Sequence, residues 1–372
     1  MSSPSQQFND DLISDARDRG LATEIFPDVL HIFDFPELRE LFLSHDIPAN
    51  LAKRRRSLFG FVAIGLGAVA LFGASVAQDN WPPTLAVVCA ALGAVSLLLG
   101  WFGTLSGETK RVWLCSRLMT ESLRQFHFQT LVYRLPAVLA STRGGAAQRR
   151  FIEERRGWLA EFRLQYEGHL PARLRAVLDD DAEEDFLLHP EGNWDHDLSG
   201  SDTSLQKVFL AYRLLRFEHQ IQYANYRLGA DQSIFSTSAT RRLEVLRNLA
   251  LVFILVGFVA NLALVALLGF GPKLGLSPSA ADQNVILTTA HVLVIGLFVG
   301  VVAVRTLEEG LQPAREVDRY IRYRSAMLSL LRRFDKELDP REKLKIMCDA
   351  ERASYQEMRG FLKTHYDARY VL

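Results

Sequence analysis

Four long apolar stretches constrain this chain more than any other feature of its sequence. They run near residues 57–78, 82–103, 248–270 and 284–304, and their interiors contain no Asp, Glu, Lys or Arg. A helix needs roughly 20 apolar residues to cross a hydrocarbon core about 30 Å thick. Two pairs of buried core helices in a large soluble protein are the alternative, but soluble helices normally keep one polar face. The pattern therefore predicts four transmembrane helices in two hairpins.

Basic residues flank these stretches on one side of the predicted membrane. The connections at the other side, residues 79–83 and 271–283, are short and contain a single basic residue, Lys273. Cytoplasmic flanks carry the excess of Lys and Arg in membrane proteins, so we expect both termini and the long middle segment to be cytoplasmic. The basic flanks are Lys53, Arg54, Arg55, Arg56, Lys110, Arg111, Arg241, Arg242, Arg247 and Arg305.

The polar remainder of the chain has the periodicity of helices. Tyr320, Tyr323 and Met327 recur at three- and four-residue steps, and a similar stripe resumes beyond Asp339-Pro340. Alternating patterns typical of strands are absent, so the expected fold is an all-α integral membrane protein with a cytoplasmic helical domain. The expected segments are an N-terminal cytoplasmic helical segment (1–56), hairpin 1 (57–103), cytoplasmic helices (104–178), an acidic linker (179–204), a cytoplasmic helix leading into the membrane (205–247), hairpin 2 (248–304) and C-terminal cytoplasmic helices (305–372).

An acidic block separates the two halves of the chain. Residues 179–202 contain ten Asp and Glu side chains and no Lys or Arg, which favours a solvated linker. Part of the block resembles an EF-hand calcium loop, with Asp195, Asp197 and Ser199 at its first, third and fifth places. Gln206 replaces the bidentate Glu at the twelfth place, so these three residues form a weak calcium candidate and we expect no bound metal.

Composition and motifs exclude several classes of function. Lys and Arg together number 43, as do Asp and Glu, so no overall basic charge points to a nucleic-acid partner. Phosphate-binding loops, catalytic serine motifs and zinc motifs are absent from the sequence. We therefore expect neither an enzyme nor a cofactor.

Small residues punctuate the apolar stretches. Such residues let membrane helices approach closely where no hydrophobic force acts between them. Packing within one subunit and packing between subunits of a homo-oligomer both remain open. The packing candidates are Gly60, Gly67, Ala90, Gly93, Gly296 and Gly300.

Polar residues inside the second predicted hairpin are candidates for a conduction path. Asn261 and His291 each lie roughly 10 to 12 Å below the outer surface, counting about 1.5 Å per residue, and Thr288 lies one turn from His291. Polar groups are costly in lipid, so they should face protein or water. A hydrogen bond between helices is the alternative to a pore-lining role.

Four arginines follow the Gly144-Gly145 pair and concentrate positive charge on a predicted helix. They are Arg149, Arg150, Arg155 and Arg156. Guanidinium groups bind phosphate through paired hydrogen bonds, so an anionic nucleotide or lipid head groups are candidate ligands. A solvated helix face is the alternative.

Three further segments carry a family resemblance. Trp113-x-x-x-Arg117-x-x-x-Glu121-x-Leu123-Arg124 and Tyr212-x-x-x-Arg216-x-x-x-Gln220-x-x-Tyr223 resemble the helices that flank the membrane hairpin in SLATT domains. The tail from Glu351 to Met358 looks like the closing helix of that family. SLATT domains are two-transmembrane effectors associated with bacterial nucleotide-sensing conflict systems.

The resemblance implies a pore-forming effector that oligomerises in the bacterial inner (plasma) membrane and responds to a cytoplasmic sensor protein or a nucleotide second messenger. It implies gating roles at the cytoplasmic interface for Trp113, Arg117, Glu121, Tyr212, Arg216, Gln220 and Tyr223. This chain has two predicted hairpins where the family has one, and its first 50 residues match poorly. A membrane-anchored scaffold for a cytoplasmic sensor or enzyme is the main alternative function, and a small secondary transporter is a further one.

Overall fold

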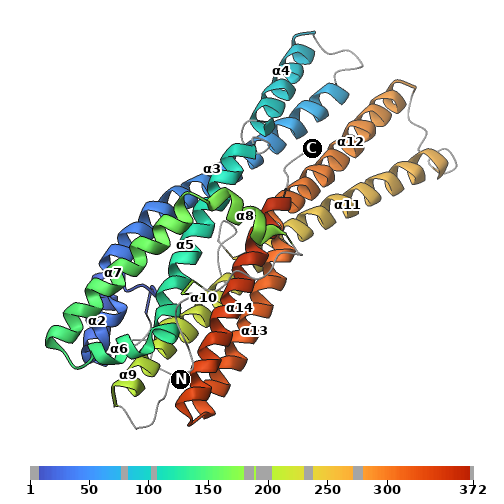
Figure 1. The fold of residues 1–372 in the computed structure, drawn as a ribbon. Coiled ribbons are helices and arrows are strands. Elements are labelled where there is room, and N and C mark those ends of the chain that lie inside the picture. The colour runs from blue at the N-terminus through green and yellow to red at the C-terminus, as the bar shows by residue number, and fades with distance from the viewer. Residues whose placement is uncertain are drawn as a thin grey trace. The chain divides into compact units, whose positions relative to one another are not determined.

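The structure is a computed structural model, and it describes residues 8–76, 83–101, 107–179, 188–189, 203–229, 238–270 and 280–368. All regular secondary structure in these ranges is helical (Figure 1). The chain forms two compact units. The first, called here the helical unit, comprises Met1–Leu51, Arg111–Gly229 and Arg315–Tyr366, and the second, the apolar unit, comprises Ala52–Lys110, Ala230–Ala314 and Asp367–Leu372.

The helical unit is built from the N-terminal turns, the middle of the chain and its C-terminal helices. Its elements are α1 (Ala16–Ile25), η2 (Pro27–Val29), α2 (Leu30–Phe33), the start of α3 (Pro36–Val76), most of α5 (Gly107–Tyr133), α6 (Leu135–Ser141), α7 (Gly145–Glu167), α8 (Leu170–Leu178), α9 (Thr203–Tyr212), the π-helical segment η5 (Arg213–Glu218), α10 (His219–Leu228), most of α13 (Pro313–Lys336) and α14 (Pro340–Asp367).

Local signals place several helix ends in this unit. Asp15 caps α1 by accepting a 2.6 Å hydrogen bond from the Asp18 amide, which satisfies a donor that has no partner within the helix. The predicted break at Asp339-Pro340 is confirmed, because α13 ends at Lys336 and α14 begins at Pro340. Asp339 accepts from the Arg341 amide at 2.9 Å and so caps the start of α14.

The core of the helical unit is aromatic and aliphatic. Phe26, Phe33 and Phe128 are fully buried in one cluster, where they meet the predicted apolar stripes of α13 and α14. Met327 and Met347 from those stripes are both 0% exposed. Burying such a side chain contributes about 1.5–3 kcal/mol, so these stripes hold the two C-terminal helices on the unit.

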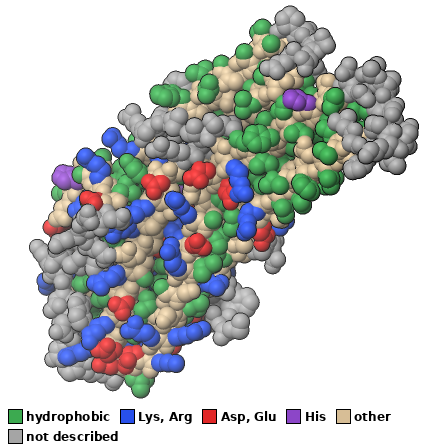
Figure 2. Space-filling model, turned by 90° about the vertical axis from the view of Figure 1, so that its right-hand side faces the viewer, with side chains coloured by type: hydrophobic (Ala, Val, Ile, Leu, Met, Phe, Trp, Pro, Cys, Tyr) green, Lys and Arg blue, Asp and Glu red, His purple; other side chains and the backbone are tan. Residues whose placement is uncertain are grey.

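The apolar unit contains the rest of α3, α4 (Pro83–Gly100), α11 (Ala239–Phe270) and α12 (Ala280–Leu311). In the described part of the chain, three helices are long and apolar enough to cross a membrane: Pro36–Val76, which is α3, Ala239–Leu267 within α11, and Val285–Lys336, which covers most of α12 and continues through α13. The remaining predicted stretch forms the shorter apolar helix α4. On the face shown in Figure 2, hydrophobic side chains gather on this unit, whereas Lys, Arg, Asp and Glu side chains gather on the helical unit. The most apolar windows of α11 and α12 are almost wholly unburied, as expected for association with a membrane.

Small residues mediate the helix contacts of the apolar unit. Ser96 of α4 donates to the Ala63 carbonyl of α3 at 2.7 Å, which pairs the two helices. A Cβ at Gly296 would lie 2.8 Å from the Phe72 ring, and one at Gly300 would lie 2.9 Å from the Phe253 ring. Gly296 and Gly300 of α12 therefore each make room for an aromatic side chain.

The other packing candidates divide between the contact face and the open surface. Gly60 and Gly67 are buried, and Gly93 is in ordinary contact range of Ala70. Ala90 is exposed, and its neighbour Cys89 makes the close approach to α3 instead.

Candidate functional site

The polar candidates of the apolar unit lie on its surface. Thr288, His291 and Asn261 are all exposed. The Asn261 amide donates to the Gly257 carbonyl of its own helix at 2.8 Å. Asn261 and His291 form no hydrogen bond with each other, so the structure does not bring these two side chains together.

The contacts of α12 show which way its polar residues point. Leu297 lies against Gly257 of α11, and Val304 is buried in a cluster with α11 residues. At about 100° per residue, Thr288 and His291 project from the opposite half of α12. They form a polar face on an apolar helix, and this face is turned away from the residues of α12 that contact α11.

A buried network of charged side chains occupies the helical unit. Its centre is Asp11, which is 0% exposed. Arg124 of α5 binds the Asp11 carboxylate with its Nε at 3.0 and 2.9 Å from the two oxygens. Gln220 of α10 donates to the same carboxylate at 2.9 Å, and Arg216 lies 3.8 Å away. Asp11 thus joins the N-terminal turns to α5, η5 and α10.

A bidentate ion pair extends the network to α14. Arg216 donates from Nε and Nη2 to the two oxygens of Glu351, at 2.9 and 2.6 Å. Tyr212 donates to the same carboxylate at 2.7 Å, and the Arg216 guanidinium lies over the Phe128 ring. Arg216 is 1% exposed and Glu351 is 0% exposed. The π-helical segment η5 carries Arg216 into this position, as such segments do at many functional sites.

The other end of the network lies along α5. Glu121 forms ion pairs with Arg117 and with Arg124, the latter at 2.6 Å. Arg117 also reaches Asp46 of α3 at 3.1 Å. Together, the two ion pairs of Glu121 and the pair between Arg117 and Asp46 connect α3 to the Asp11 centre through α5.

Arginine partners favour the ionised forms of Asp11 and Glu121 despite burial. Burial alone would raise the pKa of Asp11, but Arg124, His219 and Arg216 together hold that pKa well below its usual value. Burial likewise opposes ionisation of Glu121, and its two arginine partners lower the pKa. Removing one partner from such a pair costs much more than the pair contributes as a whole. The network therefore favours one arrangement of the helices that it joins, because losing any one partner would leave another charge buried and unpaired.

Six of the seven predicted gating residues are buried or half-buried in this unit. Arg117, Glu121, Tyr212, Arg216 and Gln220 belong to the network described above. Trp113 is also buried, but it packs on the Phe361 and His365 rings of α14 instead. Tyr223 is 39% exposed and contacts the Tyr320 ring at its edge.

The predicted arginine cluster divides into two kinds of residue. Arg155 is buried and Arg156 is exposed, and both line a pocket of the helical unit. Arg149 and Arg150 are exposed and do not line it, and Arg150 pairs with Glu154 at 2.7 Å. One helix thus carries both a buried cation and a solvated basic face.

Within the described ranges, no group of three or more His, Cys, Asp or Glu side chains is placed to hold a metal ion. The weak calcium candidate, Asp195, Asp197 and Ser199, lies outside those ranges. No known protein family, curated protein or solved structure matches this chain. The resemblance to SLATT domains therefore stays a prediction.

Proposed function

We propose that this chain is a pore- or channel-forming membrane effector of a bacterial conflict system, acting by permeabilising or depolarising the inner membrane. In this proposal α3, α4, α11 and α12 cross the membrane as two hairpins and the helical unit is cytoplasmic. Several copies assemble around an axis. The observation that carries the proposal is the polar face of α12, formed by Thr288 and His291 on the side away from α11.

The energetics of the bilayer support this use of the polar face. An imidazole facing lipid is costly, and ionisable side chains in membrane helices normally face protein or a water-filled cavity. His291 is exposed in the single chain and bonds to none of the described side chains. A ring of such faces from several copies would provide a polar lining, as polar residues do in channels.

The buried network supports a gating role for the helical unit. Asp11, Arg216 and Glu351 couple four segments that are far apart in the sequence. A buried ionic network resists gradual deformation, because losing one partner strands another charge. In the proposed mechanism it holds the cytoplasmic helices in one arrangement, and an activating signal shifts them to another.

Substituted cysteines test the pore lining directly. Thr288→Cys and His291→Cys are placed one at a time in a chain whose Cys89, Cys115 and Cys348 have been replaced. A membrane-impermeant charged thiol reagent is then applied to membranes containing activated protein. Both cysteines are expected to react at least tenfold faster than Thr289→Cys, a matched neighbour about 100° around the helix. Equal rates at Thr288 and Thr289 would contradict the assignment and leave a scaffold as the better account.

A further inference from the structure

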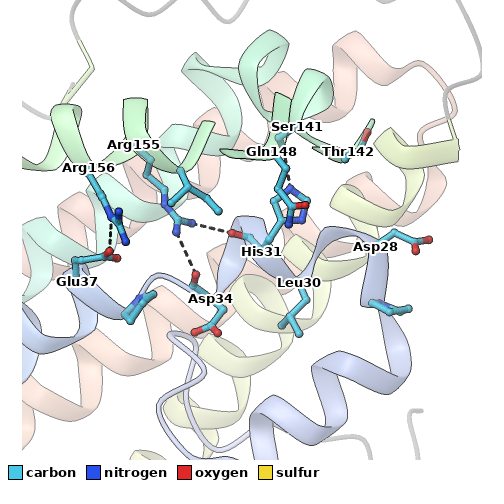
Figure 3. A pocket seen from close by; sticks show the side chains of 14 residues that line it. Asp28, Leu30, His31, Asp34, Glu37, Ser141, Thr142, Gln148, Arg155 and Arg156 are labelled. Carbon is cyan, nitrogen blue, oxygen red and sulfur yellow. Dashed lines mark hydrogen bonds and ion pairs between the residues drawn. The ribbon is translucent and has the colours of Figure 1, made fainter. Parts of the chain in front are cut away.

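A pocket of about 600 Å³ opens in the helical unit between the N-terminal turns and α7. Its volume lies within the range of about 300–1,000 Å³ typical of small-molecule sites. Figure 3 shows Arg155 projecting from α7 toward His31 and Asp34, with Arg156 and Glu37 to one side. Leu30 and Ile152 add apolar surface to its lining.

Arg155 is a buried cation to which no carboxylate of the described residues is bound. Its guanidinium donates to the carbonyls of His31 and Ile32, each at 3.0 Å, and of Asp34 at 3.2 Å. It is 3% exposed and lies 3.9 Å from the centre of the Phe35 ring. Its Nε has no hydrogen-bond partner among the described residues. A buried charge is costly unless it is paired and hydrogen-bonded, and the three carbonyls compensate this one with dipoles rather than with an opposite full charge.

Burial lowers the pKa of Arg155 to about 10, and the more distant Glu37 and Asp34 only partly offset that effect. The guanidinium therefore stays charged at neutral pH. His31, in contrast, has its pKa lowered by burial and by Arg155, so its ring is neutral there. The pocket presents one buried positive charge beside a neutral ring.

The carboxylates that line the pocket already have basic partners. Asp34 pairs with Arg39 and with Arg19, the latter at 3.6 Å. Glu37 pairs with Arg156. Asp28 pairs with Lys207. Three carboxylates and two arginines thus line the pocket, each carboxylate has a basic partner, and Arg155 is the lining arginine that has no carboxylate partner among the described residues.

The start of α7 adds donors to the same wall. Gly144 lines the pocket, and Gly144 and Gly145 have φ values of 74° and 59°, which favour glycine. Among the described residues no side chain caps this helix, and the first amide groups of a helix have no partner within it. Helix N-termini of this kind bind phosphate and other anions.

We propose that this pocket binds a soluble organic phosphate. The phosphate lies against Arg155, Arg156 and the start of α7, and the organic part contacts Leu30, Ile152 and the neutral His31 ring. The size of the pocket exceeds the needs of inorganic phosphate. This inference concerns the helical unit alone and does not depend on whether the apolar unit conducts.

Calorimetry on the full chain in phosphatidylcholine nanodiscs tests the proposal, with adenosine triphosphate and glucose 6-phosphate as probes. At least one is expected to bind with a submillimolar Kd, and Arg156→Gln is expected to weaken that binding at least tenfold. Arg163→Gln is the matched control, because Arg163 lies on the same helix, is equally exposed at 57% and also pairs with a Glu. It should change Kd less than twofold. Gln148→Trp, which fills the pocket without changing charge, should abolish binding even if Arg155→Gln fails to fold.

Four results would overturn the inference. They are binding of neither probe, equal weakening by Arg156→Gln and Arg163→Gln, unchanged binding in Gln148→Trp, and binding of inorganic phosphate as tight as that of the organic probes, which would mean an adventitious ion only. A fifth arm replaces phosphatidylcholine with phosphatidylglycerol. Binding of that lipid in the pocket, with no binding of either soluble probe, would assign the site to a lipid head group. That result would also refute a soluble ligand.

Discussion

Neutralising Glu351 is the sharpest test of the buried network. Glu351→Gln keeps the size of the side chain but removes the charge that Arg216 contacts at 2.9 and 2.6 Å. Among the described residues, Arg216 would then keep one ion-pair partner, the Asp11 carboxylate at 3.8 Å. Breaking a buried pair in this way costs about 3–5 kcal/mol. Local opening of η5 and α14 should therefore become about a hundredfold to a few thousandfold more frequent.

Hydrogen–deuterium exchange of the full chain in nanodiscs measures that opening, through peptides covering residues 203–229 and 340–366. Glu167→Gln is the control, because Glu167 forms a partly exposed pair with Arg163 and such pairs contribute about 0–1 kcal/mol. The double variant Arg216→Met with Glu351→Leu should recover most of the lost protection, since an apolar pair can replace a buried ion pair. Exchange in Glu351→Gln no faster than in Glu167→Gln would refute the reasoning.

Two further predictions concern the stability of the protein in acid and the packing of helices in the apolar unit. Burial and Arg155 lower the pKa of His127 to about 3, from a usual 6.5. As pH falls, the His127 ring is therefore protonated in the unfolded chain before it is protonated in the folded chain. The free energy of unfolding should fall by about 1.4 kcal/mol per pH unit as pH drops from 6.5 toward 3. Denaturant titrations should show a shallower fall in His127→Phe, and an unchanged slope would count against the assignment. Gly296→Ala should destabilise the apolar unit by about 1–3 kcal/mol through its contact with Phe72, with partial rescue by Phe72→Leu. Gly65→Ala, which meets nothing within 4 Å, should not destabilise the unit in the same thermal assay, and equal losses would contradict the packing.

Local patterns predicted the helices but not the partners of the buried charges. The break at Asp339-Pro340 and the stripes of α13 and α14 follow from periodicity and from proline, which act over a few residues. The segments around Arg117, Arg216 and Glu351 resemble those of one family, and the structure brings them into one network. Spacing within a segment cannot indicate which distant carboxylate an arginine will meet.

Asp11 illustrates what local reasoning missed. It lies in the first 50 residues, which carry no recognisable motif, and its partner Arg124 is 113 residues away. Arg155 is a similar case, because its acceptors at His31 and Ile32 lie more than 120 residues earlier. A run of charged residues on a helix is ordinarily solvated, so the burial of this one arginine depends on tertiary packing that the run itself does not encode.

Potassium efflux from proteoliposomes that contain the purified full chain tests the central claim most directly. The account predicts efflux from liposomes with the activated wild-type chain, a loss of at least tenfold in the Thr288→Val, His291→Leu double variant, and efflux close to wild type in Thr289→Val. The same order should hold for loss of membrane potential when the chains are induced, with any activating partner, in bacterial cells. Intact potassium gradients with the activated wild-type chain, in both liposomes and cells, would contradict the account.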